Sequence, residues 1–186
     1  MLCVPYEIKD SLVPGAGKGL FSQAAIEAGR VITAPTAIDR TIPFQELEQD
    51  DDHPHADCSI RWFEDHCTIA PDWPDECYVN HSFTPNGLWH LGFIFALRAI
   101  EPGEEITVDY RFLVGPGIRM PFLDSLTGQP IIGFSWEESL LRSSEAVYQV
   151  ARSVSRKKGA DAAIRNAPKV AGSRSGQGRK NRVDVV

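Results

Sequence analysis

Short apolar runs separated by turn residues fill the first two thirds of the chain. The run Phe93–Leu97 has the length and composition of a buried strand. It is followed by the turn Glu101–Gly103, in which proline fixes φ and glycine tolerates a positive φ. Beyond the turn, the alternation of residues predicts a strand in which Val108 and Tyr110 share an apolar face, with Asp109 on the opposite face.

More short strands are predicted before this stretch. Residues 13–21 contain three glycines in five positions, which is typical of a tight loop, and residues 25–32 predict a turn and a strand. Residues 60–63 and 67–70 predict a hairpin. Strands this short and this regularly spaced favour a mainly β fold made of small sheets.

A helix is predicted towards the C-terminus. Ser135 and Glu138 have the spacing of a capping box, which marks a helix start. The apolar residues that follow lie on one helical stripe, which we expect to dock on the rest of the fold. This stripe consists of Trp136, Leu140, Leu141, Val147, Tyr148 and Ala151.

The net charge of −6 is unevenly distributed. Residues 1–150 hold 9 basic and 23 acidic side chains, whereas residues 151–186 hold 10 basic and 2 acidic ones. An acidic body attracts cationic partners such as lysine-rich peptides and repels phosphate backbones. The glycine- and serine-rich basic segment has almost no large apolar residues, so we expect disorder from about residue 155 and a possible contact with nucleic acid.

No apolar run approaches the roughly 20 residues that a membrane-spanning helix requires. The N-terminal residues lack the basic and apolar regions of a signal peptide, so we expect a soluble, intracellular protein without membrane contact. In that compartment the four cysteines are expected to be reduced thiols. The alternative is a zinc site, although no Cys-x-x-Cys pair is present. Its candidate ligands would be His53, His55, Cys58, His66 and Cys67.

Two dense polar clusters flank the run Phe93–Leu97. They are Asn80–Ser82 and Gly103–Tyr110. Taken singly, each feature has an ordinary explanation, because Asn and Ser favour turns, a tyrosine can be a core residue with a hydrated hydroxyl, and Gly17 and Gly19 can be turn residues. Their joint occurrence indicates an active site.

These segments together resemble the SET-domain protein lysine methyltransferases. Residues 80–86, Asn-His-Ser-Phe-Thr-Pro-Asn, are similar to the Asn-His-Ser motif of that family. Residues 98–110 look like its closing motif, and residues 17–21 with the strand after them look like its opening Gly-x-Gly segment. The three motifs follow the family's order and cover about residues 10–112. Each motif is only a hypothesis until its context agrees, and here three agree.

The resemblance implies a β-clip, SET-like fold of small sheets with a threaded C-terminal segment, and with our predicted helix the class is all-β or α+β. It implies S-adenosylmethionine as cofactor and a lysine-containing basic protein or peptide as substrate. Tyr110 would be the catalytic residue. The cofactor would be bound by Gly17, Lys18, Gly19, Asn80 and His81. The substrate channel would be lined by Tyr78, Val108 and Phe112.

The chain departs from the family pattern at two points. Phe83 stands where many members have a zinc-binding cysteine, and no cysteine follows Cys77. A different aromatic residue must then complete the channel. The candidates are Phe112, Phe122, Phe134 and Trp136. Val108 stands where the family often has Phe or Tyr, so the number of methyl groups added cannot be transferred from the family.

The sequence thus predicts a protein-lysine N-methyltransferase dependent on S-adenosylmethionine. The alternative is a catalytically inactive SET-fold module that binds basic peptides through its acidic surface. We predict a catalytic domain over residues 5–115, a flanking segment with a docked helix over residues 116–154, and a basic disordered tail over residues 155–186.

Overall fold

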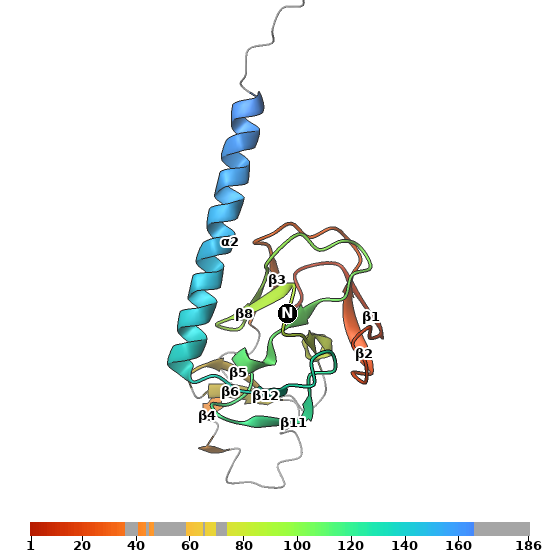
Figure 1. The fold of residues 1–186 in the computed structure, drawn as a ribbon, viewed down its shortest axis with the longest axis vertical. Coiled ribbons are helices and arrows are strands. Elements are labelled where there is room, and N and C mark those ends of the chain that lie inside the picture. The colour runs from red at the N-terminus through yellow and green to blue at the C-terminus, as the bar shows by residue number, and fades with distance from the viewer. Residues whose placement is uncertain (36–40, 44, 47–58, 65, 70–73, 166–186) are drawn as a thin grey trace, which may run out of the picture.

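The computed structural model of the chain describes residues 1–35, 41–43, 45–46, 59–64, 66–69 and 74–165. Within these residues, five small β-sheets surround one hydrophobic core, and a long C-terminal helix lies along one side of them (Figure 1). This arrangement confirms the predicted fold class of small, mostly antiparallel sheets with one C-terminal helix.

The central sheet has the strand order β3-β9-β8 and is antiparallel. These strands span Val31–Thr33, Phe93–Ala96 and Gly87–His90, respectively. The two-residue turn between β8 and β9, Leu91 and Gly92, has φ angles of 50° and 79°. Positive φ at both turn residues suits the twist of a tight hairpin. The strand predicted over residues 93–97 is therefore confirmed as β9.

Two more hairpins match the sequence predictions. Strands β1 (Tyr6–Asp10) and β2 (Lys18–Ser22) pair antiparallel, so the predicted glycine loop is the connection between them. Strands β5 (Ser59–Phe63) and β6 (His66–Ile69) form the predicted hairpin over residues 60–70. A third strand, β4 (Ile42–Pro43), pairs with β6.

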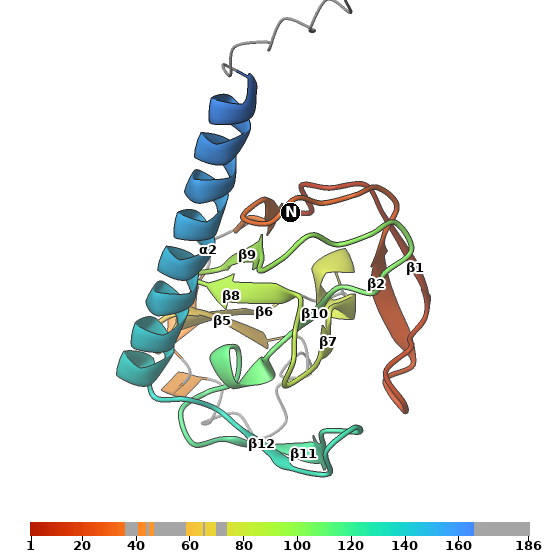
Figure 2. The same ribbon diagram turned by 45° about the horizontal axis from the view of Figure 1, so that its top comes forward.

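The two polar clusters form the one parallel strand pair among the described residues. Strand β7 (Asn80–His81) lies beside β10 (Thr107–Val108), with Asn80 opposite Thr107. The 3₁₀ helix η3 (Asp75–Tyr78) precedes β7. Just before β10 the chain also contacts β2, because the Ile106 N–H donates to the Leu20 carbonyl over 2.7 Å. The C-terminal segment of the motif region is thus held between the glycine hairpin and the Asn-His strand (Figure 2).

One strand prediction was wrong. Strand β10 ends at Val108, and Tyr110 begins the 3₁₀ helix η4 (Tyr110–Phe112) instead of continuing the alternation. The reason is local, because the Asp109 carboxylate accepts the backbone N–H of Arg111 and caps this helix. Tyr110 is thereby turned out of the strand register.

Helix α2 (Trp136–Arg165) begins where the sequence predicts. The Ser135 hydroxyl accepts the Glu138 N–H over 3.2 Å, which satisfies one of the free donors of the first turn. The hairpin of β11 (Arg119–Leu123) and β12 (Pro130–Ile132) precedes it.

The docking face of α2 differs from the predicted stripe. Leu141 is 70% exposed and Tyr148 is 57% exposed, whereas Ser139 and Ser143 are buried. The serines are small enough for close approach to β8, where the Ser143 hydroxyl bonds to His90 Nδ1 over 2.8 Å. A stripe chosen by hydrophobicity alone could not include them.

The helix also continues past the expected boundary near residue 155. It ends at Arg165, while residues 166–186 lie outside the described residues. The segment 160–163 contains three alanines, which favour helix strongly, and this offsets the polar composition that suggested disorder. The predicted division into three regions otherwise stays a prediction.

The core is formed by apolar residues from all three motif regions and the central sheet. Its fully buried members include Leu20, Ile32, Ile94, Ala96, Ile100, Ile106 and Val108.

Among the described helices, none is both long and apolar enough to cross a membrane.

The turn residue Gly92 offers a test of packing between the central sheet and β5. A Cβ atom at Gly92 would lie 2.0 Å from the Trp62 ring, whereas a Cβ at Gly103, with a similar φ of 84°, would meet no atom within 4 Å. We expect Gly92→Ala to lower the free energy of unfolding by about 2 to 4 kcal/mol and the control Gly103→Ala by about 1 kcal/mol. Urea unfolding measures both, and equal losses would contradict the packing.

Candidate active site

A buried polar cluster joins the glycine hairpin to both polar motifs. The Asn80 amide nitrogen donates to the Lys18 carbonyl over 2.7 Å and to Glu105 Oε1 over 3.0 Å. Glu105 also accepts the Ser11 hydroxyl over 2.6 Å and the Leu12 N–H over 2.7 Å. These donors satisfy the oxygens of a carboxylate that is buried, which would otherwise be costly to remove from water. Residues about ninety positions apart in sequence are therefore held together.

This cluster explains the glycine at position 19. A Cβ atom there would lie 2.2 Å from Glu105 Oε1 and 3.2 Å from Asn80 Nδ2. A side chain at position 19 would therefore displace the carboxylate from its donors. The opening motif thus requires Gly19 for close approach to the closing motif.

The two glycines in the loop before Gly19 differ from Gly19 in their backbone angles and surroundings. Gly15 and Gly17 have φ angles of 80° and 72°, and a Cβ at either would meet no atom within 4 Å. The chain turns sharply here with open space beside its backbone. Such a backbone lets a ligand approach its polar groups closely.

His81 and Tyr110 are joined directly. The Tyr110 backbone N–H donates to His81 Nδ1 over 3.1 Å, and the two rings lie 5.4 Å apart. Because Nδ1 accepts, the neutral ring carries its proton on Nε2. Nε2 faces Asp124 Oδ1 at 3.6 Å, beyond hydrogen-bond distance. Burial lowers the pKa of His81, although Asp109 and Asp124 oppose this effect.

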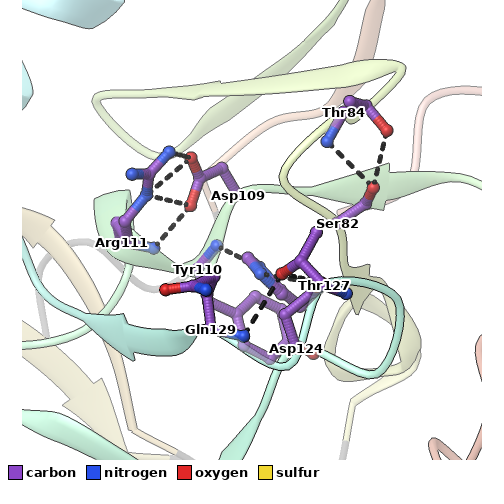
Figure 3. Close-up of polar contacts among 9 residues, drawn as sticks. Ser82, Thr84, Asp109, Tyr110, Arg111, Asp124, Thr127 and Gln129 are labelled. Atoms are coloured by element: carbon purple, nitrogen blue, oxygen red, sulfur yellow. Dashed lines mark hydrogen bonds and ion pairs between the residues drawn. The ribbon is translucent and has the colours of Figure 1, made fainter.

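Asp124 is a site residue that sequence reasoning missed. It is 3% exposed at the end of β11 and accepts the Thr127 N–H and hydroxyl over 2.7 and 2.6 Å (Figure 3). Burial alone would raise the pKa of Asp124, but the Thr127 hydrogen bonds and the nearby His81 lower it below the ordinary value. The sequence Asp-x-x-Thr-Gly signals this turn, but it carries no sign of the approach to His81.

The Tyr110 hydroxyl donates to the Val79 carbonyl over 2.9 Å. Burial, with smaller contributions from Cys77 and Glu105, raises the pKa of Tyr110 well above its ordinary value. The side chain is therefore a neutral phenol at neutral pH. It can orient a partner by hydrogen bonding, but it is not charged and cannot act as a strong base.

Sequence reasoning also missed the side-chain contacts that hold the 3₁₀ helix η4 in place. The Arg111 guanidinium bonds both oxygens of the buried Asp109 carboxylate, with Nε distances of 3.0 and 2.9 Å (Figure 3). The same guanidinium lies 4.6 Å from the Phe83 ring and 4.7 Å from the Phe134 ring. Phe83 thus forms part of a cation–π stack that holds the segment carrying Tyr110.

The three predicted channel residues have different surroundings. Tyr78 ends η3 one residue before Val79, and Val108 is 1% exposed beside His81's strand. Phe112 is 9% exposed and packs on Phe134 at 5.1 Å within the core, which is a structural position. Whether these residues line a channel stays a prediction.

Of the four aromatic candidates for closing the channel, Phe122 is the one whose ring contacts Tyr110. The ring centroids are 6.5 Å apart in an edge arrangement, and Phe122 is 47% exposed. Phe134 instead stacks on Arg111 and Arg142. Phe122 is the candidate that the geometry favours.

Metal ligation is absent from the described part of the chain, where no group of three or more His, Cys, Asp or Glu side chains could hold an ion. Three of the candidate zinc ligands, His53, His55 and Cys58, lie outside the described residues. The zinc alternative is therefore not decided by these residues.

Three features of this fold occur together. They are the small sheets, the segment held between the hairpin and the parallel strand, and the Gly, Asn-His and Tyr motifs that meet at that segment. Together they indicate a single class of β protein. The family model for the SET domain matches residues 17–111, more than half of the chain. The chain belongs to the SET-domain family. A search of curated proteins found no match.

The polar cluster generates a direct test. Glu105→Gln keeps the side-chain shape but places an amide N–H against one of the existing donors, and it removes the charge that Ser11 and Leu12 stabilise. We expect a loss of about 2 to 3 kcal/mol in the free energy of unfolding. Glu101→Gln, at an exposed position on the same segment, is the control and should change stability by less than about 0.5 kcal/mol. Similar effects of both changes in urea unfolding would contradict this role of Glu105.

The buried histidines predict a pH dependence. Burial lowers the pKa of both His81 and His90, so the unfolded state binds more protons near pH 6.5. Stability should be complete above the unfolded value and fall as the pH drops below about 6.5. Protonation of His81 Nδ1 would also remove the acceptor of the Tyr110 N–H.

The measurement is urea unfolding of wild type, His81→Gln and His90→Gln between about pH 7.5 and pH 5.5, a window around the unfolded histidine pKa. Each variant should show a shallower fall than wild type over this window. A wild-type stability that rises on acidification would reverse the predicted sign.

Proposed function

We propose that the chain is a protein-lysine N-methyltransferase that uses S-adenosylmethionine and acts on a lysine of a basic protein or peptide. The observation that carries this proposal is the link between His81 and Tyr110, which lies beside the Asn80–Glu105 cluster that anchors the glycine loop. One polar connection fixes the position of the predicted catalytic tyrosine. The other fixes the loop predicted to bind the cofactor.

The geometry is compatible with the cofactor, but it changes which atoms of the predicted residues would contact it. The side chain of Asn80 is occupied by Lys18 and Glu105, and His81 Nδ1 is occupied by Tyr110. Cofactor contacts of these residues would therefore come from their backbone groups, together with the open backbone at Gly15 and Gly17. When bound, S-adenosylmethionine supplies a methyl group on a sulfonium, which is a strong electrophile.

The substrate amine must be neutral before it can accept a methyl group. A lysine at its reference pKa near 10.4 is only about 0.04% neutral at pH 7, a deficit of roughly 4.6 kcal/mol. The buried surroundings of Tyr110 would disfavour an ammonium group and lower the pKa of the bound amine. The neutral Tyr110 hydroxyl would then orient the amine, and its present acceptor, the Val79 carbonyl, could share that role.

The charge distribution supports a basic substrate. Residues 1–150 carry 23 acidic against 9 basic side chains, so long-range attraction favours lysine-rich segments. The C-terminal end of α2 projects beyond the sheets (Figure 1), and four basic side chains in the second half of the helix are exposed. They are Arg152, Arg156, Lys157 and Lys158. A contact of this basic end with nucleic acid stays a prediction.

The test measures cofactor binding and methyl transfer to a panel of basic proteins in the same preparation. We expect wild type to do both and Tyr110→Phe to bind the cofactor but transfer about 10²-fold more slowly, since only the orienting hydroxyl is removed. Tyr148→Phe, on the exposed face of α2, is the matched control and should retain wild-type transfer.

The outcomes separate the two functions. If wild type binds basic peptides without transferring a methyl group, the inactive binding module is the correct reading. If Tyr110→Phe transfers as fast as wild type, the catalytic assignment of Tyr110 is wrong.

A further inference from the structure

A small cavity lies on the α2 side of the fold, where the first two turns of the helix meet β5 and β8. It has a volume of about 10 Å³, which is room for one water-sized occupant. Its lining residues include Arg61, Trp62, Trp89, His90, Trp136 and Ser143, and none of the described side chains that line it is acidic. The predicted cofactor and tyrosine residues do not line it.

Arg61 makes this cavity unusual. The side chain is 1% exposed, and Nη1 donates to the Phe134 carbonyl over 3.1 Å. Nη2 is buried and has no hydrogen-bond partner. Across the described residues, no carboxylate forms an ion pair with Arg61, and burial is the one cause that lowers its pKa. Since a guanidinium stays protonated in proteins, a full positive charge is buried here with no counter-charge from the described residues.

The other polar groups at the cavity do not compensate this charge. Trp62 Nε1 donates to the Thr68 hydroxyl over 2.6 Å, and His90 Nδ1 is paired with Ser143. The pKa of His90 is lowered by burial, so it adds no second charge at neutral pH. A water molecule could satisfy the Nη2 donor but would leave the charge uncompensated. A small anion does both.

We propose that this cavity binds a small monovalent anion of the size of chloride, held by Arg61 Nη2 where helix α2 docks on the body. The absence of acidic lining residues and the single-occupant volume select a small anion over a larger carboxylate or phosphate. The bound anion would stabilise the folded state in proportion to its occupancy. This role is independent of methyl transfer.

Tryptophan fluorescence provides the test, because three of the four tryptophans line the cavity and bromide quenches indole emission. Potassium bromide is titrated against potassium fluoride at constant ionic strength. We expect wild type to show a saturable quenching component that added chloride reverses, and Arg61→Met to lose that component. The control Arg152→Met changes an exposed arginine on α2 and should retain the saturable component.

A second measurement on wild type does not depend on whether Arg61→Met folds. The melting temperature should rise when chloride replaces fluoride at constant ionic strength, and should level off as the site fills. Quenching that is strictly linear in bromide and insensitive to chloride, with an unchanged melting temperature, would overturn the proposal and leave water as the occupant.

Discussion

The buried Glu105 carboxylate is the interaction on which the arrangement of the site depends. Its donors come from the glycine hairpin through Ser11 and Leu12 and from the Asn-His strand through Asn80. Removing any one donor leaves a charge in a place that water does not reach freely, so the cluster is stable only when all three segments are in place. The same condition sets Gly19, because a larger residue would occupy the position of the carboxylate oxygen.

This arrangement separates two tasks within the motifs. The polar side chains Asn80, His81 and Glu105 are used to hold segments together, and Asn86 does the same by accepting the Thr107 N–H and donating to the Glu105 carbonyl. The functional surfaces that remain are backbone groups and the Tyr110 hydroxyl. A motif rich in polar residues therefore need not place those side chains on a ligand.

Local patterns predicted the local structure well. The strand from Phe93, the hairpin of β5 and β6 and the Ser135 cap depend on neighbours within a few residues, and these predictions were confirmed. The departure of Tyr110 from its strand depends on one side chain, Asp109, which caps a helix that alternation does not reveal. The docking face of α2 includes two serines. The sequence did not predict them, because their fit depends on a partner in β8 that lies more than fifty residues away along the chain.

Two of the contacts that the sequence could not supply come from outside the matched family region. The hairpin of β11 and β12 follows residue 111 and brings Asp124 to His81 and Phe122 to Tyr110. The turn at Asp124 can be recognised in the sequence, but the partners that the hairpin reaches cannot, so only the three-dimensional arrangement reveals both contacts. Phe122 lies beside Tyr110 and Val108 is buried, so under the proposed function this hairpin would be one wall of the substrate channel.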